Sequence, residues 1–245
     1  VTSPVAEGEK AVRVTGRRVT ETGRTVSETR LPRGQRVRCV ARQQLVEAPA
    51  DAARRAGAGI VLNAEAASAT PEGRLTFADG SFTEADLVVA ADGVGSRIRD
   101  ALGLLKSSRR LPDGATRVMA ARVPAEEDDP GMVVEAWAGG RRVLHTPCAE
   151  AEVSLALCAR DDDARAVATP VDVAASGGWF PDRAPMIGRI AGPARYDRLG
   201  QWTLSRRSAG RVAILGDAAH ATPPNIGQGA GCSMMNALAL AAWLD

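Results

Sequence analysis

The stretch from Gly210 to Asp245 constrains the fold of this chain more than any other part of its sequence. It reads GRVAILGDAAHATPPNIGQGAGCSMMNALALAAWLD, so a short apolar run is followed by a loop and then by a long Ala/Leu/Met run. This order predicts a buried strand, RVAILGD, then a loop, then a helix that begins near Gly229. In open α/β sheets, ligands bind beyond the carboxyl ends of such strands. We therefore expect an α/β layer that binds a ligand at this loop.

The residues of the loop suit a ligand with a polyol arm and a ring that can become negative. Asp217, at the end of the predicted strand, can accept hydrogen bonds from sugar-like hydroxyls. The three glycines at alternate positions from Gly227 to Gly231 would let the backbone approach a flat ligand, because they carry no Cβ. The amides at the start of the final helix would favour an anion, and Pro223 and Pro224 would stiffen the loop. The alternative is a glycine-rich helix start that binds nothing.

Residues 12–57 predict a hairpin followed by a helix. Apolar or β-branched residues alternate with polar ones over 12–31, and TETGRT supplies a turn. The helix is predicted over 41–57, in ARQQLVEAPADAARRAG, where Gly57 is a suitable C-terminal cap. Pro49 is expected to kink this helix or divide it.

Residues 60–104 predict further strands and a short helix. IVLNAEA, at 60–66, is expected to be a strand, and RLTFADGSFTEA a hairpin that turns at Asp79-Gly80. ADLVVAADG is an unbroken apolar run, of the kind buried on both faces of a parallel sheet. A helix is expected from about Ser96 to Leu102.

The middle of the chain, 105–205, is rich in strand-like runs. Strands are predicted in TRVMAARV, MVVEAWA and VSLALCA, and DDDARAVA is expected to open a helix. His145 lies in a strand-like stretch and is expected to be structural or to line a substrate site. Trp137, Trp179 and Trp202 could line an aromatic pocket, with core packing as the alternative for each.

Composition argues against several classes of partner. A formal net charge of +2 gives no electrostatic case for nucleic-acid binding. The four cysteines have neither CxxC nor metal-ligand spacing and are expected to be reduced thiols. The chain shows no signal-peptide pattern, and its final apolar run is too short to span a bilayer. We therefore expect a cytoplasmic protein with no metal, nucleic-acid or membrane partner.

Two motifs carry a resemblance to a known family. GDAAHATPPNIGQGAGCSMMNALALA closely resembles the second flavin-binding motif of the FAD-dependent aromatic hydroxylases, the single-component, p-hydroxybenzoate-hydroxylase-like monooxygenases. DLVVAADGVGSRIRDALGL resembles their Asp-Gly motif, and ARQQL resembles the arginine segment that precedes it. The resemblance extends from about Arg38 to Asp245 and is most specific at 86–99 and 211–240. Within the family, the resemblance of PPNIGQGAGCSMMNAL leans toward the pyridine-ring oxygenases, and it names no substrate.

The resemblance implies a mixed α/β fold, with a Rossmann-like FAD-binding layer and an inserted β-rich substrate lobe, incomplete at both ends. The implied domains are 1–104, a partial FAD-binding domain with the hairpin; 105–205, the substrate domain; and 206–245, the second flavin motif and its helix. The flavin-binding layer itself is expected over roughly 36–104 and 206–245.

At the C-terminal motif, the resemblance gives each loop residue a role. Asp217 would bind the ribityl chain of FAD. Pro223 and the backbone from Gly227 through Gln228 to Gly229 would lie along the isoalloxazine ring. The positive end of the final helix would face the N1–C2=O edge of the flavin. His220 is expected to belong to the fold of the motif rather than to act as a general base.

The upstream motifs supply the other implied contacts. Arg42 would contact the pyrophosphate or the ribityl region of FAD. Asp92, with Gly93, would serve FAD and the docking of NAD(P)H, and Arg99 would support this loop.

The implied activity is hydroxylation of a small aromatic or heteroaromatic molecule, with FAD as cofactor and NAD(P)H and O₂ as co-substrates. NAD(P)H would reduce the flavin, O₂ would add at its C4a carbon, and the resulting hydroperoxide would transfer oxygen to the ring. The protein would supply orientation, electrostatics and exclusion of water. The first alternative is an inactive remnant of such an enzyme. The second is a flavin-dependent halogenase, although SGGWFPDRAP does not match the Trp-x-Trp-x-Ile-Pro motif of that class.

The sequence departs from the family pattern at its beginning. The family opens with a strand, a GxGxxG turn and a helix that hold the ADP half of FAD, whereas this chain opens with VTSPVAEGEK and contains no such element. We expect at least one βαβ unit, about 30 residues or more, to be absent at the front. The chain is therefore expected to be a fragment that binds flavin weakly and exposes the edge of a sheet.

Overall fold

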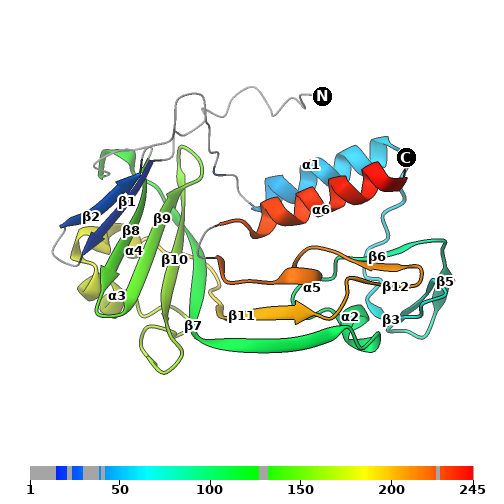
Figure 1. Cartoon of the computed structure of the whole chain (residues 1–245). Coiled ribbons are helices and arrows are strands. Elements are labelled where there is room, and N and C mark those ends of the chain that lie inside the picture. The colour runs from blue at the N-terminus through cyan, green and yellow to red at the C-terminus, as the bar shows by residue number, and fades with distance from the viewer. Residues whose placement is uncertain are drawn as a thin grey trace. The chain divides into compact units, whose positions relative to one another are not determined.

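The computed structural model describes residues 15–20, 24–29, 39, 42–126, 132–224 and 227–244 (Figure 1). The chain divides into two compact units. The first comprises Val1–Gly59 and Pro112–Arg198, and the second comprises Ile60–Leu111 and Leu199–Asp245. Helices and three β-sheets together confirm the predicted mixed α/β class. The predicted domain boundaries, after residues 104 and 205, stay a prediction.

The largest sheet has seven strands in the order β11-β7-β10-β9-β8-β1-β2. Its strands are β1 (Thr15–Thr20), β2 (Thr25–Thr29), β7 (Leu105–Ala121), β8 (Met132–Ala138), β9 (Arg141–Pro147), β10 (Glu152–Arg160) and β11 (Tyr196–Leu204). β1 and β2 form an antiparallel pair, which confirms the predicted hairpin. β1 runs parallel to β8, while β8, β9, β10 and β7 are antiparallel neighbours. The strands predicted within 116–160 are thus confirmed.

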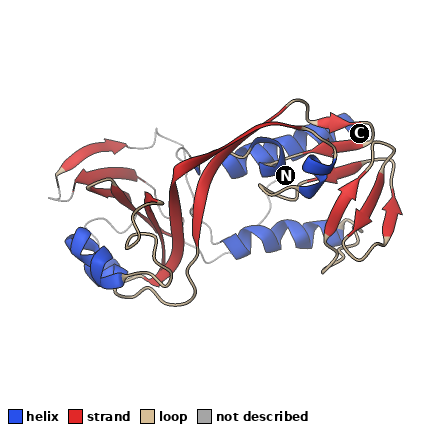
Figure 2. Cartoon of the chain, turned by 90° about the horizontal axis from the view of Figure 1, so that it is seen from below, coloured by secondary structure: helices blue, strands red, loops and turns tan. Residues whose placement is uncertain are grey.

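One face of this sheet forms the core of the first unit. Every second residue along β8, β9 and β10 is buried, as the period-two geometry of a strand requires. These residues pack against Phe180, Met186 and Ile187, which belong to or adjoin α3 (Val173–Trp179) and α4 (Ala184–Ile187). Figure 2 shows short helices gathered to one side of the strands.

The sequence placed a helix in the wrong part of this region. Residues 161–168 form turns instead of the predicted helix, and α3 begins only after Asp172. Asp163 is held by other contacts: its carboxylate accepts a hydrogen bond from the Ala166 amide at 3.3 Å and pairs with Arg141 at 2.7 Å. α3 starts where the Asp172 side chain caps it, accepting from the Ala175 amide at 2.9 Å.

The first unit also contains α1, Arg42–Arg55. The helix continues through Pro49, so of the two predicted effects of this residue the division is wrong, and the kink stays a prediction. Its end is as predicted: Gly57 has a φ of 86°, and the Ala58 amide donates to the Ala53 carbonyl at 3.0 Å. Among the described helices, none combines the length and the apolar character needed to cross a membrane.

The described residues of the second unit form two small sheets and three α-helices. One sheet has the order β12-β13-β6 and the other the order β3-β4-β5. Their strands are β3 (Ala66–Ala69), β4 (Arg74–Phe77), β5 (Phe82–Glu84), β6 (Val88–Ala90), β12 (Ser208–Ala209) and β13 (Val212–Ile214). The helices are α2 (Arg97–Ala101), α5 (Asp217–His220) and α6 (Gly229–Leu244), and α2 and α6 lie where the sequence predicts them. The predicted turn at Asp79-Gly80 also joins β4 to β5.

Two strand predictions in this unit are corrected by the structure. Only Ala66 of the predicted strand 60–66 is in a strand, because Asn63 adopts a left-handed φ of 56° that interrupts an extended backbone. The run ADLVVAADG does form a strand of a parallel pair, but it is not buried on both faces. Val88 and Ala90 are buried, whereas Val89 is 44% exposed. Among the described strands, β6 pairs only with β13, so its other edge and one face are uncovered.

Candidate functional site

The two predicted cofactor motifs meet at one edge of the small parallel sheet. β6 and β13 run in the same direction, with Val88 opposite Val212 and Ala90 opposite Ile214. Their carboxyl ends therefore lie side by side, and each is followed directly by one of the motif loops (Figure 1). Ligands of α/β sheets bind at such an edge.

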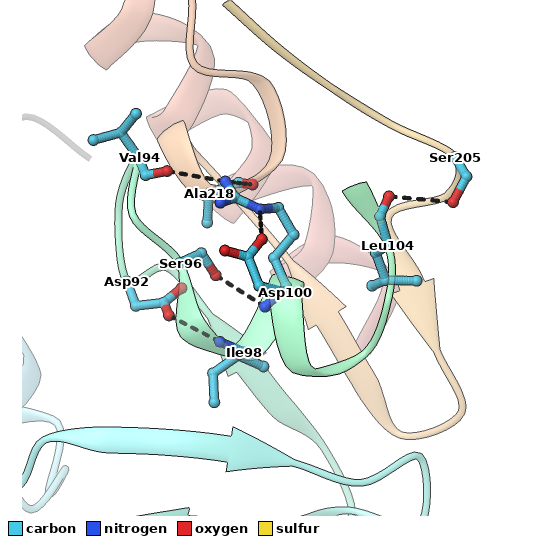
Figure 3. Close-up of polar contacts among 9 residues, drawn as sticks. Asp92, Val94, Ser96, Ile98, Asp100, Leu104, Ser205 and Ala218 are labelled. Carbon is cyan, nitrogen blue, oxygen red and sulfur yellow. Dashed lines mark hydrogen bonds and ion pairs between the residues drawn. The ribbon is translucent and has the colours of Figure 1, made fainter. Parts of the chain in front are cut away.

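The first loop carries Asp92 and leads into α2. Ser96 is fully buried and caps the helix, since its Oγ accepts a hydrogen bond from the Arg99 amide at 3.0 Å. Asp92 Oδ2 accepts from the Ile98 amide at 3.4 Å, so the carboxylate is also directed by the start of α2 (Figure 3). Asp92 is nevertheless exposed, so its carboxylate can contact a ligand.

A buried guanidinium joins this loop to the second motif. Arg99 is 2% exposed. Its Nε donates to Asp100 Oδ1 at 2.8 Å, and one terminal nitrogen donates to the Val94 carbonyl at 3.0 Å and to the Ala218 carbonyl at 3.4 Å (Figure 3). The resemblance implied support of the first loop only. The bond to Ala218, across 119 residues of sequence, was not predicted.

The second loop begins with a glycine that the backbone requires. Gly216 has a φ of 59°, and a Cβ at this position would lie 3.1 Å from Ser233 Oγ. The turn carries Asp217 into α5, whose Ala218 and Ala219 are buried in the core of the unit. Asp217 itself is exposed, and its Oδ1 would lie 3.9 Å from a Cβ at Gly229. The carboxylate therefore stands beside the first residue of α6.

Two side-chain contacts fix the beginning of α6. His220 Nε2 and Asn236 Oδ1 are 2.7 Å apart, which ties α5 to the middle of α6. Ser233 Oγ donates to the Gly229 carbonyl at 2.9 Å within the helix. These contacts give His220 a part in packing α6 against the Asp217 turn.

The remaining predicted residues are divided between the two units. Pro223 is half-buried, and Gly227, with a φ of 65°, and Gln228 are exposed in the segment that leads to α6. The residues between them, 225 and 226, lie outside the described part of the chain. Asp92, Gly93, Asp217, Pro223 and 227–229 all belong to the second unit. Arg42 is the exposed first residue of α1 and belongs to the first unit.

The other candidate residues have packing contacts. His145 is 1% exposed in β9, and burial, with the charges of Arg183 and Arg122, lowers its pKa to about 4. The Arg142 guanidinium lies 5.4 Å from the centre of the Trp137 ring, and that of Arg141 lies 3.9 Å from the Trp179 ring. Trp202 lies half-buried in β11, among the residues of the second unit.

The residues at the edge of the parallel sheet fit FAD in their chemistry and in the space they leave. A Cβ placed on Gly93, Gly95 or Gly227 would meet no other atom within 4 Å, so the backbone is open to a ligand at all three positions. An exposed carboxylate can accept hydrogen bonds from ribityl hydroxyls. The start of a 16-residue helix presents amides and partial positive charge to an anionic ring.

Comparison with known proteins gives this site its family. A family model described as an FAD binding domain matches residues 6–244. The chain belongs to the FAD-dependent aromatic hydroxylase family. This membership confirms the resemblance drawn from the motifs.

Two curated relatives and one solved structure show how this hydroxylase-family chain compares. It is 43% identical over 218 residues to a 2-heptyl-3-hydroxy-4(1H)-quinolone synthase from Mycobacteroides abscessus, covering 86% of this chain and 57% of the relative. It is 32% identical over 178 residues to a 3-amino-4-hydroxybenzoate 2-monooxygenase from Streptomyces cremeus, covering 70% and 44%. The structure of 2-methyl-3-hydroxypyridine-5-carboxylic acid oxygenase superposes with a TM-score of 0.88 at 35% identity, covering 94% of this chain and 64% of that one. The chain therefore spans less than two thirds of each relative.

Proposed function

We propose that this chain provides the flavin-ring and ribityl part of the FAD site in a monooxygenase that uses NAD(P)H and O₂ to hydroxylate a small aromatic or heteroaromatic molecule. One observation carries the proposal: the parallel pairing of β6 and β13 places both motif loops at one edge of one sheet. FAD supplies the chemistry of oxygen activation when bound. The protein's part is to hold the flavin, orient the substrate and exclude water.

Each described residue of the site has a proposed contact with FAD. Asp217 accepts hydrogen bonds from the ribityl chain, and the amides that begin α6 face the N1–C2=O edge of the ring. Pro223 and the backbone of 227–229 lie along the ring. Asp92, with Gly93, serves FAD and the docking of NAD(P)H. A helix start favours the anionic form of a reduced flavin, so α6 stabilises the state that reacts with O₂.

The proposed substrate is a small ring that is already rich in electrons. The names of the compared relatives refer to a quinolone, an aminohydroxybenzoate and a hydroxypyridine carboxylic acid. Hydroxyl and amino groups on such rings donate electron density, which favours transfer of an electrophilic oxygen. The relatives support a hydroxylated or oxo-substituted aromatic or nitrogen heteroaromatic ring as the substrate class.

A second candidate is a member of the family that has no catalytic activity. The 245 residues contain no GxGxxG turn, which holds the pyrophosphate of FAD in dinucleotide-binding folds, and this does not decide between the two candidates. The two candidates differ in one measurable respect. A monooxygenase accelerates oxidation of NAD(P)H when its aromatic substrate is present, whereas an inactive member does not.

The variant Asp217→Ala tests the flavin site. Loss of a charge-assisted hydrogen bond costs about 1.5–3 kcal/mol, so FAD affinity should fall roughly ten- to hundredfold. The measurement is titration of the apoprotein with FAD, followed by quenching of flavin fluorescence.

Asp86→Ala is the matched control for this titration. Asp86 is an exposed carboxylate of the same unit and pairs with Arg211 at 3.4 Å. It should leave FAD affinity unchanged. Equal affinity of the wild-type protein and Asp217→Ala would assign Asp217 to the helix entry and contradict the proposed contact.

A further inference from the structure

The Arg99 side chain is a buried cation whose hydrogen bonds end in both motif loops. Its acceptors are a carboxylate on its own helix and two backbone carbonyls. Val94 lies two residues after Asp92, and Ala218 directly follows Asp217. One terminal nitrogen of the guanidinium serves both carbonyls. The two loops are therefore linked through a single group.

Burial makes this link stiff. A charged group out of water is costly unless its hydrogen bonds are made, so Arg99 holds both carbonyls in place. Ala218 is 0% exposed, so in the folded unit its carbonyl accepts from the guanidinium out of contact with water. The first loop is also fixed from the other side, because Ser96 caps the helix that carries Arg99.

The geometry also connects Arg99 to the two carboxylates proposed to meet FAD. Asp92 accepts a hydrogen bond from the Ile98 amide, one residue before Arg99 in α2. Asp217 begins α5, in which the Ala218 carbonyl is the acceptor of the guanidinium. The positions of both carboxylates therefore depend on the same buried side chain, Arg99.

We propose that Arg99 is a positioning residue that couples Asp92 to Asp217, so that the two carboxylates meet the flavin as one unit. Arg99 touches neither carboxylate; it acts by fixing the backbone next to each. The inference rests on the proposed FAD site for its functional meaning. The coupling itself is a property of the protein alone and can be measured without FAD.

Hydrogen exchange of the full chain, without FAD, tests the coupling in Arg99→Lys. Lysine keeps the charge but lacks the planar fork that reaches several acceptors at once. We expect amide exchange to accelerate about tenfold or more both in 92–98 and in 216–221. Arg97→Lys is the control, because Arg97 lies on the same helix but is exposed and pairs with Glu65 at 2.9 Å. It should change neither segment.

A second variant keeps the test decisive if Arg99→Lys fails to fold. Asp100→Asn removes the charge that orients the guanidinium, and the Asp100 side chain is 53% exposed, so the change leaves the core intact. It should accelerate exchange in the same two segments to a smaller extent. Acceleration confined to 92–98, or an equal acceleration that includes β3–β5, would overturn the proposal. The first result would make Arg99 a local support, and the second a general stabiliser of the unit.

A double-mutant cycle on FAD affinity then tests the functional meaning. The losses caused by Asp92→Ala and Asp217→Ala should deviate from additivity by about threefold or more in the wild-type background and be additive in Arg99→Lys. Additive losses in both backgrounds would overturn the coupling and leave the FAD site standing. If neither the wild type nor any variant binds FAD even when fused to the N-terminal βαβ segment of a relative, the proposed function fails, and the exchange data alone decide the coupling.

Discussion

A single backbone angle at Gly216 shapes the second motif loop. Its φ of 59° lies in a region that L-residues with a Cβ rarely adopt, and an added Cβ would approach Ser233 Oγ to 3.1 Å. The turn it makes carries Asp217 out of the sheet and toward the first residue of α6. The glycine is thus required by the conformation of the loop and by the proximity of α6.

Gly216→Ala should therefore destabilise the second unit. Residues held in such unfavourable conformations cost about 1–3 kcal/mol, and the free energy of unfolding should fall by that amount in urea titrations. Gly95→Ala is the control, because Gly95 has no left-handed φ and a Cβ there meets nothing within 4 Å. Equal stabilities of the two variants would show that the turn can relax.

The lowered pKa of His145 predicts how the stability of the first unit depends on pH. Its pKa falls to about 4 in the folded protein through burial and the charges of Arg183 and Arg122. An unfolded histidine binds a proton below about pH 6.5, so the unfolded state binds more protons between these values. Folding stability is therefore full above about pH 6.5 and is lost as the pH falls, by about 3 kcal/mol at pH 4.

Unfolding curves at several pH values, for the wild type and His145→Gln, check this expectation. The substitution should flatten the part of the pH dependence between about 4 and 6.5. Thr116→Val, a change at another buried polar residue of the same sheet that does not titrate, should leave the slope as it is. An unchanged slope in His145→Gln would contradict the prediction.

At the scale of elements, α3 offers a matched pair of glycines. Gly177 and Gly178 are neighbours in the helix, but a Cβ at Gly178 would meet nothing within 4 Å, whereas one at Gly177 would lie 3.3 Å from Ala184 Cβ. Alanine is favoured over glycine within helices by about 0.5–1 kcal/mol. Gly178→Ala should stabilise the first unit by that amount in thermal unfolding. Gly177→Ala should raise the stability by less than Gly178→Ala does, or lower it. An equal increase would show that α4 shifts to accommodate the added Cβ without a cost in stability.

α3 also shows where local sequence signals fail to predict secondary structure. Two hairpins, the helix from about Ser96 and the start of α6 follow from local signals such as alternation and glycine placement, and these were predicted. α3 contains two adjacent glycines, which lower its local helix preference, and it is stabilised by packing of Phe180 and its neighbours on the sheet. Residues 161–168 have the opposite character, since a helical composition is overridden by the contacts of Asp163.

The candidate site shows the same division between local and distant information. Asp92, Asp217 and the glycines stand in contiguous motifs, so the sequence alone was enough to propose them as site residues. The contact between Arg99 and Ala218 joins residues 119 positions apart and leaves no pattern in either motif. The exposure of Val89 also depends on which strands surround β6, and the apolar run alone did not reveal it.

At the scale of the whole molecule, FAD affinity should depend on a segment that the 245 residues do not contain. The proposed site would contact the ring and the ribityl chain, and the 245 residues contain no GxGxxG turn to bind the pyrophosphate. We expect the chain to lose FAD on desalting and to retain it when fused to the N-terminal βαβ segment of a relative. The visible spectrum after desalting is the measurement. Stoichiometric FAD on the 245-residue chain would contradict this expectation, and a fusion with the GxGxxG glycines replaced is the control.

The separation of Arg99 and Ala218 in sequence also determines when their contact can form during synthesis of the chain. A ribosome adds about 5–20 residues per second, so the 119 residues between them take roughly 6 to 24 seconds to make. During that interval the nascent chain has the first loop but neither β13 nor the carbonyl that completes the guanidinium's bonds. The proposed FAD site can therefore form only after Ala218 has been added to the chain. A substitution that slows synthesis between Arg99 and Ala218 lengthens the time during which the Arg99 guanidinium lacks its hydrogen bond to the Ala218 carbonyl.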